Sequence, residues 1–174
     1  GEAAAKRAGV PQWHRADHAA YEHALAENVA PLIVELMGHH DAFLAPATTT
    51  GKNVAPRVAA RLDGMQLSDI RSVEGSKTFK RPIYAGNAIA TVQSTAAIKV
   101  ITARATCFDA LAAAGGSAAV ETVAAAPDAG KSAFVGVEQT NSAIGLLLSG
   151  ERALISCVAV SLHKARILVC LSSC

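Results

Sequence analysis

Aromatic side chains are scarce in this 174-residue chain, where they make up 4% of the residues although 51% are hydrophobic. Alanine and valine supply much of that apolar content. A chain of this length can bury roughly 70% of the surface that it would expose when extended. We therefore expect one domain, or one domain plus part of another, with a core of small and β-branched side chains. Such a core suits close packing of helices on a sheet.

An excess of charge is also lacking, since 16 basic and 14 acidic residues give a net charge of +2. No basic stripe interleaved with aromatics is present, so nucleic-acid binding is disfavoured. The longest uncharged run in the tail, 153–162, is far shorter than the roughly 20 residues of a membrane helix. We expect a soluble protein with no membrane insertion and no nucleic-acid partner.

Paired cysteines are missing as well. The four cysteines form no C-x-x-C pair, and three of them lie in the tail. This pattern is neither a zinc site nor a disulfide framework, and it indicates a reducing compartment. Cys107 is interpreted as a packed small hydrophobe, because nothing in its sequence context suggests a lowered thiol pKa.

Catalytic and metal-binding constellations are also absent from the pattern. No Ser/His/Asp arrangement or pair of carboxylates stands out. All histidines except His163 precede Asp41. They include His14 and His18, which are four positions apart, and the adjacent pair His39 and His40. Neither pair has a third ligand, so we expect solvated loop histidines and no metal site.

The stretch 45–104 organises the chain. A short apolar strand at 41–45 leads to a loop of small residues, Thr48-Thr49-Thr50-Gly51, and then to a helix with Val54, Val58 and Leu62 on one face. We expect Asn53 to cap this helix and Pro56 to fall in its first turns. The pattern is half of a βαβ unit, with the loop at the carboxyl end of a parallel strand, where α/β sheets place ligands.

The loop 48–52 admits two interpretations. Its N–H groups could hold a phosphate at the helix start, with Lys52 nearby. However, the spacing does not fit G-x-x-x-x-G-K-[ST], and a capped helix that contacts a partner subunit explains the same residues.

The remaining segments predict further strands and one helix. Residues 10–16 indicate an edge strand at best, followed by Asp17 as a cap. Apolar residues at helical spacing over 21–37 are interrupted by Pro31, which predicts a kink or two pieces, the second starting near 26–28. The other expected strands are 65–73, an antiparallel hairpin of 78–85 and 88–94, 99–103, 118–124 and 143–149, with a linker at 126–130.

The order of these elements predicts an α/β fold with three layers, a mostly parallel sheet and an antiparallel hairpin annex. Arg81 and Arg104 are each expected at a strand terminus, in surface or interdomain ion pairs. The chain opens at Gly1 rather than at a methionine, and residues 2–9 resemble the end of a helix with a glycine C-cap. We therefore expect sequence upstream of residue 1.

A series of segments in fixed order carries a family resemblance. They are TTTGKNVAPRVAARLD (48–63), QLSDI (66–70), TF and RPIYAGNAIATV (78–92), KVITARATCFDA (99–110), GGSAAVETV (115–123) and SAFVG (132–136). Together they resemble the amino-terminal domain of the electron transfer flavoprotein alpha subunit. The similarity runs over about 2–136 and is densest over 45–109.

The resemblance implies an adenine-nucleotide-hydrolase-like fold with a scaffold role and a beta subunit as partner. In that family FAD is held mainly by a second, carboxy-terminal alpha domain, and AMP, where present, lies in the beta subunit. The resemblance further implies that the complete protein is an electron carrier rather than an enzyme. It would pass electrons from acyl-CoA and related dehydrogenases to electron transfer flavoprotein-quinone oxidoreductase, in fatty acid beta-oxidation. The expected location is the cytoplasm of a bacterium or the mitochondrial matrix of a eukaryote.

The resemblance also divides the chain. Residues 1–136 correspond to the amino-terminal domain without its first strand, 137–156 to a linker and the start of the FAD domain, and 157–174 match nothing in the family. The run SGERAL at 149–154 places Arg152 at the family's flavin-contacting arginine, whereas Glu151 replaces a glycine. We expect a truncated or frame-shifted reading that does not retain FAD by itself.

Three functions remain open at this stage. The favoured hypothesis is a partial alpha subunit that supplies scaffold and beta-subunit contacts. The alternative is a stand-alone nucleotide-binding α/β module that uses the loop 48–52. The third is a degenerate product without function.

Overall fold

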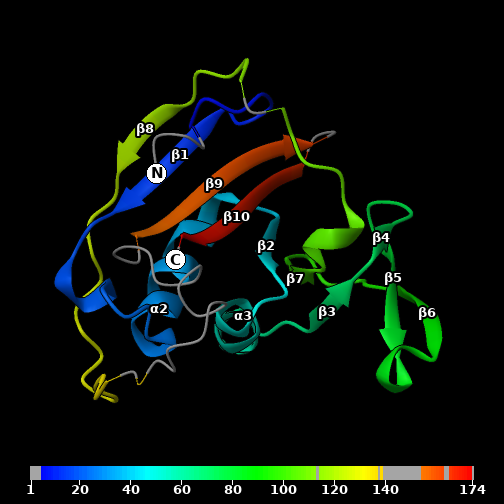
Figure 1. Cartoon of the computed structure of the whole chain (residues 1–174), viewed down its shortest axis with the longest axis horizontal. Helices are drawn as coiled ribbons and strands as arrows, with labels where there is room; N and C mark the ends of the chain where they lie inside the picture. Colours follow the sequence, from blue (N-terminus) through cyan, green and yellow to red (C-terminus); the bar gives the residue numbers. More distant parts are fainter. Residues whose placement is uncertain (1–4, 113, 137, 139–153, 163–164, 174) are drawn as a thin grey trace.

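The computed structural model describes residues 5–112, 114–136, 138, 154–162 and 165–173. Within them a seven-stranded sheet has the order β3-β7-β2-β10-β9-β1-β8 (Figure 1). Its strands are β1 (Gln12–Ala16), β2 (Ala42–Pro46), β3 (Gln66–Ile70), β7 (Lys99–Ala103), β8 (Ala119–Thr122), β9 (Leu154–Leu162) and β10 (Ala165–Ser173).

Most of this sheet is parallel. The pairs β3–β7, β7–β2, β2–β10 and β1–β8 are parallel, whereas β9 is antiparallel to both of its neighbours. A second, antiparallel sheet has the order β4-β5-β6, with β4 (Ser72–Val73), β5 (Thr78–Ile83) and β6 (Ala88–Gln93). The predicted fold class is confirmed: the chain is α/β, consistent with three layers, and carries an antiparallel annex.

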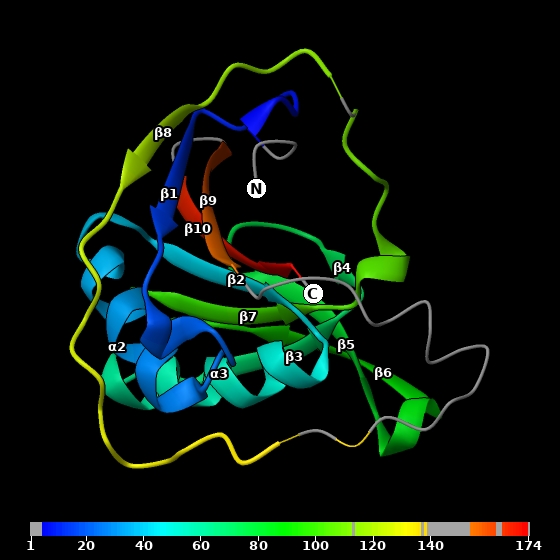
Figure 2. The same cartoon turned by 60° about the vertical axis from the view of Figure 1, so that its left-hand side comes forward.

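Two helices, α2 (Ala26–Leu36) and α3 (Thr49–Arg61), lie side by side against one face of the main sheet (Figure 2). Their apolar faces meet Phe43 and Ala45 of β2 and Val100 of β7 in the principal core cluster. Phe43 and Val100 are fully buried. The helices thus pack on the sheet through mostly small side chains, as the composition predicted.

The helix predicted around Pro31 does fall into two pieces. Tyr21 belongs to a short 3-10 helix, η1 (Ala19–Tyr21), and α2 begins at Ala26 with Pro31 inside it. The expected cap is wrong, because His18 rather than Asp17 caps η1: the His18 Nδ1 accepts the Ala20 N–H at 3.2 Å. The Ala126 N–H bonds the Tyr21 hydroxyl at 2.8 Å, which fastens the predicted linker over this helical layer.

The expected start of α3 is wrong by five residues. Thr48 is the N-cap, and its Oγ1 accepts the Gly51 N–H at 3.3 Å. Asn53 therefore lies inside the helix, and so does Pro56, well beyond the first turn. Both Thr48 and Asn53 are residue types that cap helices, and the structure selects the one nearest the end of β2.

Residues 10–16 do not form an edge strand. β1 pairs with β8 on one side and with β9 on the other, and Trp13 is 3% exposed. The polar residues of β1 are typical of an edge strand. The two strands that flank it are more than 100 positions away in the sequence, so no local pattern indicated its interior place. β8, predicted over 118–124, takes the edge instead.

The strand expected over 65–73 is two strands in different sheets. β3 pairs with β7 up to Ile70, with a register shift after Leu67, and β4 then pairs with β5. The hairpin of β5 and β6 is confirmed, with Ile83 opposite Ala88. Gly9 has a left-handed φ of 80°, but the expected glycine C-cap is wrong, because residues 6–9 form turns and Arg7 forms an isolated bridge with Gly115. The strand expected over 143–149 lies outside the described residues.

Candidate functional site

The carboxyl ends of β2, β7 and β3 meet the start of α3, so the predicted loop 48–52 can be judged there. It is the first turn of the helix, not a loop. A Cβ added to Gly51 would lie 2.0 Å from the Pro46 carbonyl oxygen, so only glycine permits this approach of helix to strand. Thr48 already accepts one of the turn's N–H groups. This geometry favours the capped-helix interpretation.

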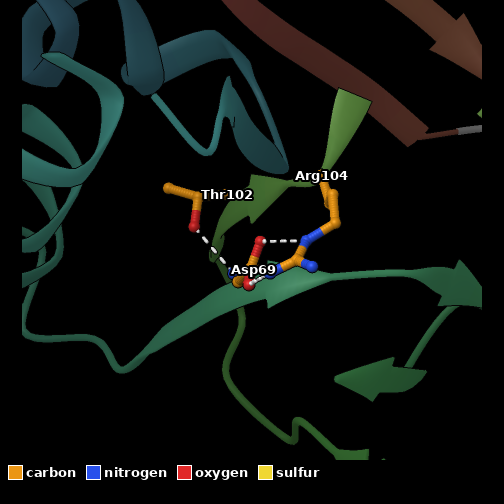
Figure 3. Close-up of polar contacts among 3 residues, drawn as sticks. All are labelled: Asp69, Thr102 and Arg104. Carbon is orange, nitrogen blue, oxygen red and sulfur yellow. Dashed lines mark hydrogen bonds and ion pairs between the residues drawn. The ribbon is translucent and has the colours of Figure 1, made fainter. Parts of the chain in front are cut away.

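An ion pair between Arg104 and Asp69 lies at the same edge of the sheet (Figure 3). Arg104 follows β7, and its Nε donates to Asp69 Oδ1 at 3.1 Å while its Nη2 donates to Asp69 Oδ2. The Asp69 N–H donates to Thr102 Oγ1 at 2.9 Å. Asp69 has φ 58°, a left-handed conformation that aspartate tolerates better than most residues. These bonds hold the backbone in that conformation where β3 shifts register and the chain leaves for the annex.

The electrostatics of this edge are set by three cations around one carboxylate. The hydrogen bond from Arg104 lowers the pKa of Asp69 against the opposing effect of burial, and the charges of Arg104, Lys52 and Arg71 lower it further. Asp69 in turn raises the pKa of Arg104. The Arg104 guanidinium is therefore engaged by the protein's own carboxylate. These residues do not fit a flavin site, because the Arg104 guanidinium is already paired with Asp69.

The prediction of an ion pair for Arg104 is confirmed, although Asp69 was not foreseen as its partner. Asp69 and Arg104 are 35 positions apart, so no local signal connects them. Arg81 differs from the prediction, because it lies inside β5 rather than at its end. No ion pair of Arg81 occurs within the described residues.

His14 is not a solvated loop histidine, so that expectation is wrong. It lies in β1, is 8% exposed, and its Nδ1 lies 3.3 Å from Glu121 Oε2 of β8. Burial lowers its pKa despite the opposing charge of Glu121. A strand was expected over 118–124, but its pairing with β1 was not, and β8 is the neighbour that supplies the Glu121 carboxylate.

Cys107 is exposed rather than packed, because the short η4 (Ala105–Cys107) lies on the surface after β7. In the described part of the chain no group of three or more metal-ligating side chains occurs, and no helix is long and apolar enough to cross a membrane. Arg152, the expected FAD contact, lies outside the described residues.

These features define a mostly parallel α/β domain with an antiparallel annex beyond β3. The sequence profile described as "Electron transfer flavoprotein domain" matches residues 1–128, most of the chain. The chain therefore belongs to the electron transfer flavoprotein family.

The similar curated proteins are alpha subunits. "Electron transfer flavoprotein subunit alpha" of Pseudomonas aeruginosa is 61% identical over 157 residues, which cover 87% of this chain and 51% of that protein. The protein of the same name in Paracoccus denitrificans is 51% identical over 87% of this chain and 49% of its own length. "Electron transfer flavoprotein subunit alpha, mitochondrial" of Dictyostelium discoideum is 45% identical over 126 residues, which cover 68% of this chain and 36% of that protein. The chain thus spans about half the length of its bacterial relatives in this comparison.

Proposed function

We propose that this chain is part of the alpha subunit of a heterodimeric electron transfer flavoprotein and supplies scaffold and beta-subunit contacts. The observation that carries the proposal is the family match over residues 1–128, together with 61% identity to a bacterial alpha subunit. The ion pair at the carboxyl edge of the sheet supports a scaffold role, because the Arg104 guanidinium is bound to Asp69.

The complete protein would carry electrons through FAD, as an electron carrier and not as an enzyme. Its donors would be acyl-CoA and related dehydrogenases, and its acceptor electron transfer flavoprotein-quinone oxidoreductase. Its place would be the bacterial cytoplasm or the mitochondrial matrix. Residues 1–136 would form the amino-terminal domain, 137–156 the linker and the start of the FAD domain, and 157–174 a tail without a family counterpart.

Arg152 would be the remaining FAD contact in this chain, and it is too little to hold the cofactor. A charge-assisted hydrogen bond contributes about 1.5–3 kcal/mol, whereas micromolar affinity needs about 8 kcal/mol. The purified chain should therefore be colourless. Its absorption spectrum after purification in excess FAD is the measurement, and stoichiometric flavin would contradict this expectation.

The proposed function is tested by co-expressing the chain with the beta subunit of the relative from Pseudomonas aeruginosa. An affinity tag on the chain should retain the beta subunit in a 1:1 complex through size-exclusion chromatography. A beta subunit that elutes alone, while the tagged chain is folded by circular dichroism, would exclude this function.

A second candidate is the stand-alone nucleotide-binding module. Lys52, in the first turn of α3, favours it, since cations and helix N-termini attract phosphates. Titration of the isolated chain with AMP distinguishes the two functions. Saturable binding that is lost in Lys52→Ala would support the nucleotide-binding module, and absence of binding would dismiss it.

A further inference from the structure

One row across the main sheet contains four residues with ionisable side chains, each from a different strand. β1 sets His14 opposite Glu121 of β8 on one side and opposite Cys157 of β9 on the other. β9 in turn sets Cys157 opposite Cys170 of β10. Paired positions on neighbouring strands lie on the same face of a sheet. A glutamate, a histidine and two cysteines therefore follow one another along a single face.

The two cysteines occupy directly opposite positions well inside the hairpin of β9 and β10. The Cys157–Cys170 pair has five register pairs on the side of the turn and three on the other side. Opposite residues of an antiparallel pair have Cα atoms about 4.5 or 5.5 Å apart, and disulfides usually have Cα atoms about 4.4–6.8 Å apart. The backbone register alone therefore places this pair within disulfide range.

His14 supplies a base beside the first of these cysteines. It is 8% exposed, and neither ring nitrogen has a hydrogen-bond partner in the described part of the chain. Its Nδ1 lies 3.3 Å from Glu121 Oε2, an oxygen that also accepts from the Gln12 amide. A protonated His14 would thus face a carboxylate, while the neutral ring has a nitrogen free to accept a proton.

The titratable residues that flank His14 favour its neutral form at pH 7. Burial lowers the pKa of His14, the charge of Glu121 opposes this, and His40, with its ring centroid 6.1 Å away, lowers the pKa further. Cys157 occupies the register position on the remaining side. A neutral imidazole can take the proton of a thiol, and the thiolate is the reactive form of cysteine.

We propose that Cys157 and Cys170 are a redox-sensitive pair, which hydrogen peroxide oxidises to a disulfide with His14 as the base. His14 takes the proton of the Cys157 thiol, and the thiolate sulfur attacks one peroxide oxygen. The O–O bond breaks, a sulfenic acid forms on Cys157, and the leaving oxygen takes the proton from His14 to become water. The Cys170 sulfur then attacks the sulfenic sulfur, and the S–S bond forms while the hydroxyl leaves with the Cys170 proton as a second water. The two thiols supply two electrons, which reduce the peroxide.

Oxidation would reinforce the middle of the main sheet. β9 pairs with β1 and β10 pairs with β2, so the disulfide would join the two strands on which the continuity of the sheet depends. A disulfide stabilises mainly by constraining the unfolded chain. In reducing compartments such bonds are usually transient and sense the redox state. This inference needs neither a flavin nor a beta subunit and is independent of the proposed function.

The test uses the full chain with Cys107→Ser and Cys174→Ser, so that Cys157 and Cys170 are its only cysteines. After treatment with hydrogen peroxide and digestion with trypsin, mass spectrometry should find the peptide containing Cys157 joined to the one containing Cys170. Trypsin separates them because it cleaves after Lys164. The oxidised protein should remain monomeric and have a Tm higher by about 6 °C or more than the reduced protein.

The matched control is Cys170→Ser in the same background. Its Cys157 should stop at the sulfenic acid, which dimedone labels, and its Tm should not rise. Absence of joined peptides from monomeric protein that is folded by circular dichroism would overturn the proposal.

The role of His14 is tested by the pH dependence of oxidation. His14→Gln keeps a polar side chain but cannot accept the proton, so disulfide formation at pH 7 should slow by roughly tenfold or more. The pH midpoint of its rate should rise toward the ordinary thiol pKa of about 8.5. Glu121→Gln, at a side chain that is 56% exposed, should shift both quantities in the same direction without unfolding the chain. Glu22→Gln, on the exposed surface after η1, should leave both unchanged. Unchanged rates and midpoints in both His14→Gln and Glu121→Gln would overturn the role given to His14.

Discussion

Asp69 shows how one residue connects backbone conformation to charge. Its left-handed φ ends the regular pairing of β3, and its N–H and carboxylate are both held by residues at the end of β7, Thr102 and Arg104. Because Lys52 and Arg71 also lower its pKa, Asp69 moderates the positive charge at this edge. The residue thus directs the chain into the annex.

The acid dependence of stability follows from this arrangement. Folding lowers the pKa of Asp69 below its ordinary value of 3.8, so the unfolded chain binds more protons in that range. Its stabilising contribution is complete above the ordinary value and is lost as the pH falls through the folded value. Asp69→Asn removes the charge but tolerates the same φ, so the variant should be less stable at pH 7 and lose less stability on acidification.

Urea unfolding at pH 7 and at pH 3 measures this effect. Asp63→Asn is the matched control, because Asp63 also has a positive φ, 51°, and is exposed in a turn. Equal pH dependence of Asp69→Asn and the wild type would show that the ion pair does not contribute to stability.

At the scale of elements, α3 depends on how it begins. Thr48 caps the helix while Gly51 allows its first turn to lie against Pro46. Val54, Val58 and Ala59 then face the core beside α2. A shift of the helix start to Asn53 would leave this contact with β2 unmade. The cap and the packing therefore select the same register.

Substitution of the two possible caps separates them. Thr48→Ala should lower the free energy of unfolding by about 1 kcal/mol, since it removes the side-chain acceptor of the cap. Asn53→Ala should cause no loss, because alanine is the better helix former inside a helix. Chemical denaturation measures both. A larger loss for Asn53→Ala than for Thr48→Ala would place the helix start where the sequence pattern had it.

For the whole molecule, the hairpin of β9 and β10 joins the two halves of the main sheet. β10 pairs with β2, and β9 pairs with β1. The two neighbouring strands, β1 and β2, are therefore connected within the sheet only by their hydrogen bonds to this hairpin. Strands without such partners present open edges that associate with other chains. The continuity of the sheet depends on this segment.

Deletion of residues 154–174 should therefore expose the edges of β1 and β2. We expect Tm to fall by about 6 °C or more, as for a loss of about 2 kcal/mol in a domain of this size, and the protein to self-associate in light scattering. Leu168→Pro within β10 should act in the same direction, and Val135→Pro, outside any helix or strand, is the control. A monomeric deletion variant with an unchanged Tm would contradict the role given to the hairpin.

Much of the fold could be predicted because its signals are local. Helical periodicity identified α2, the small-residue start of a βαβ unit identified β2 and α3, and the hairpin of β5 and β6 followed from its turn. The Asp69–Arg104 pair, the burial of His14 and the interior place of β1 could not be predicted. Each depends on a partner at least 35 positions away, and a single sequence shows no trace of such pairing.

The sequence by itself determined the family, the α/β class and the near-neutral charge, because these follow from the order of the motifs and from the composition, which do not depend on how the chain folds. Only the tertiary structure decided that the stretch around Thr48 is a capped helix packed on β2, and that Arg104 is neutralised by Asp69. Whether a cation is paired depends on distances between strands, and these exist only once the chain has folded.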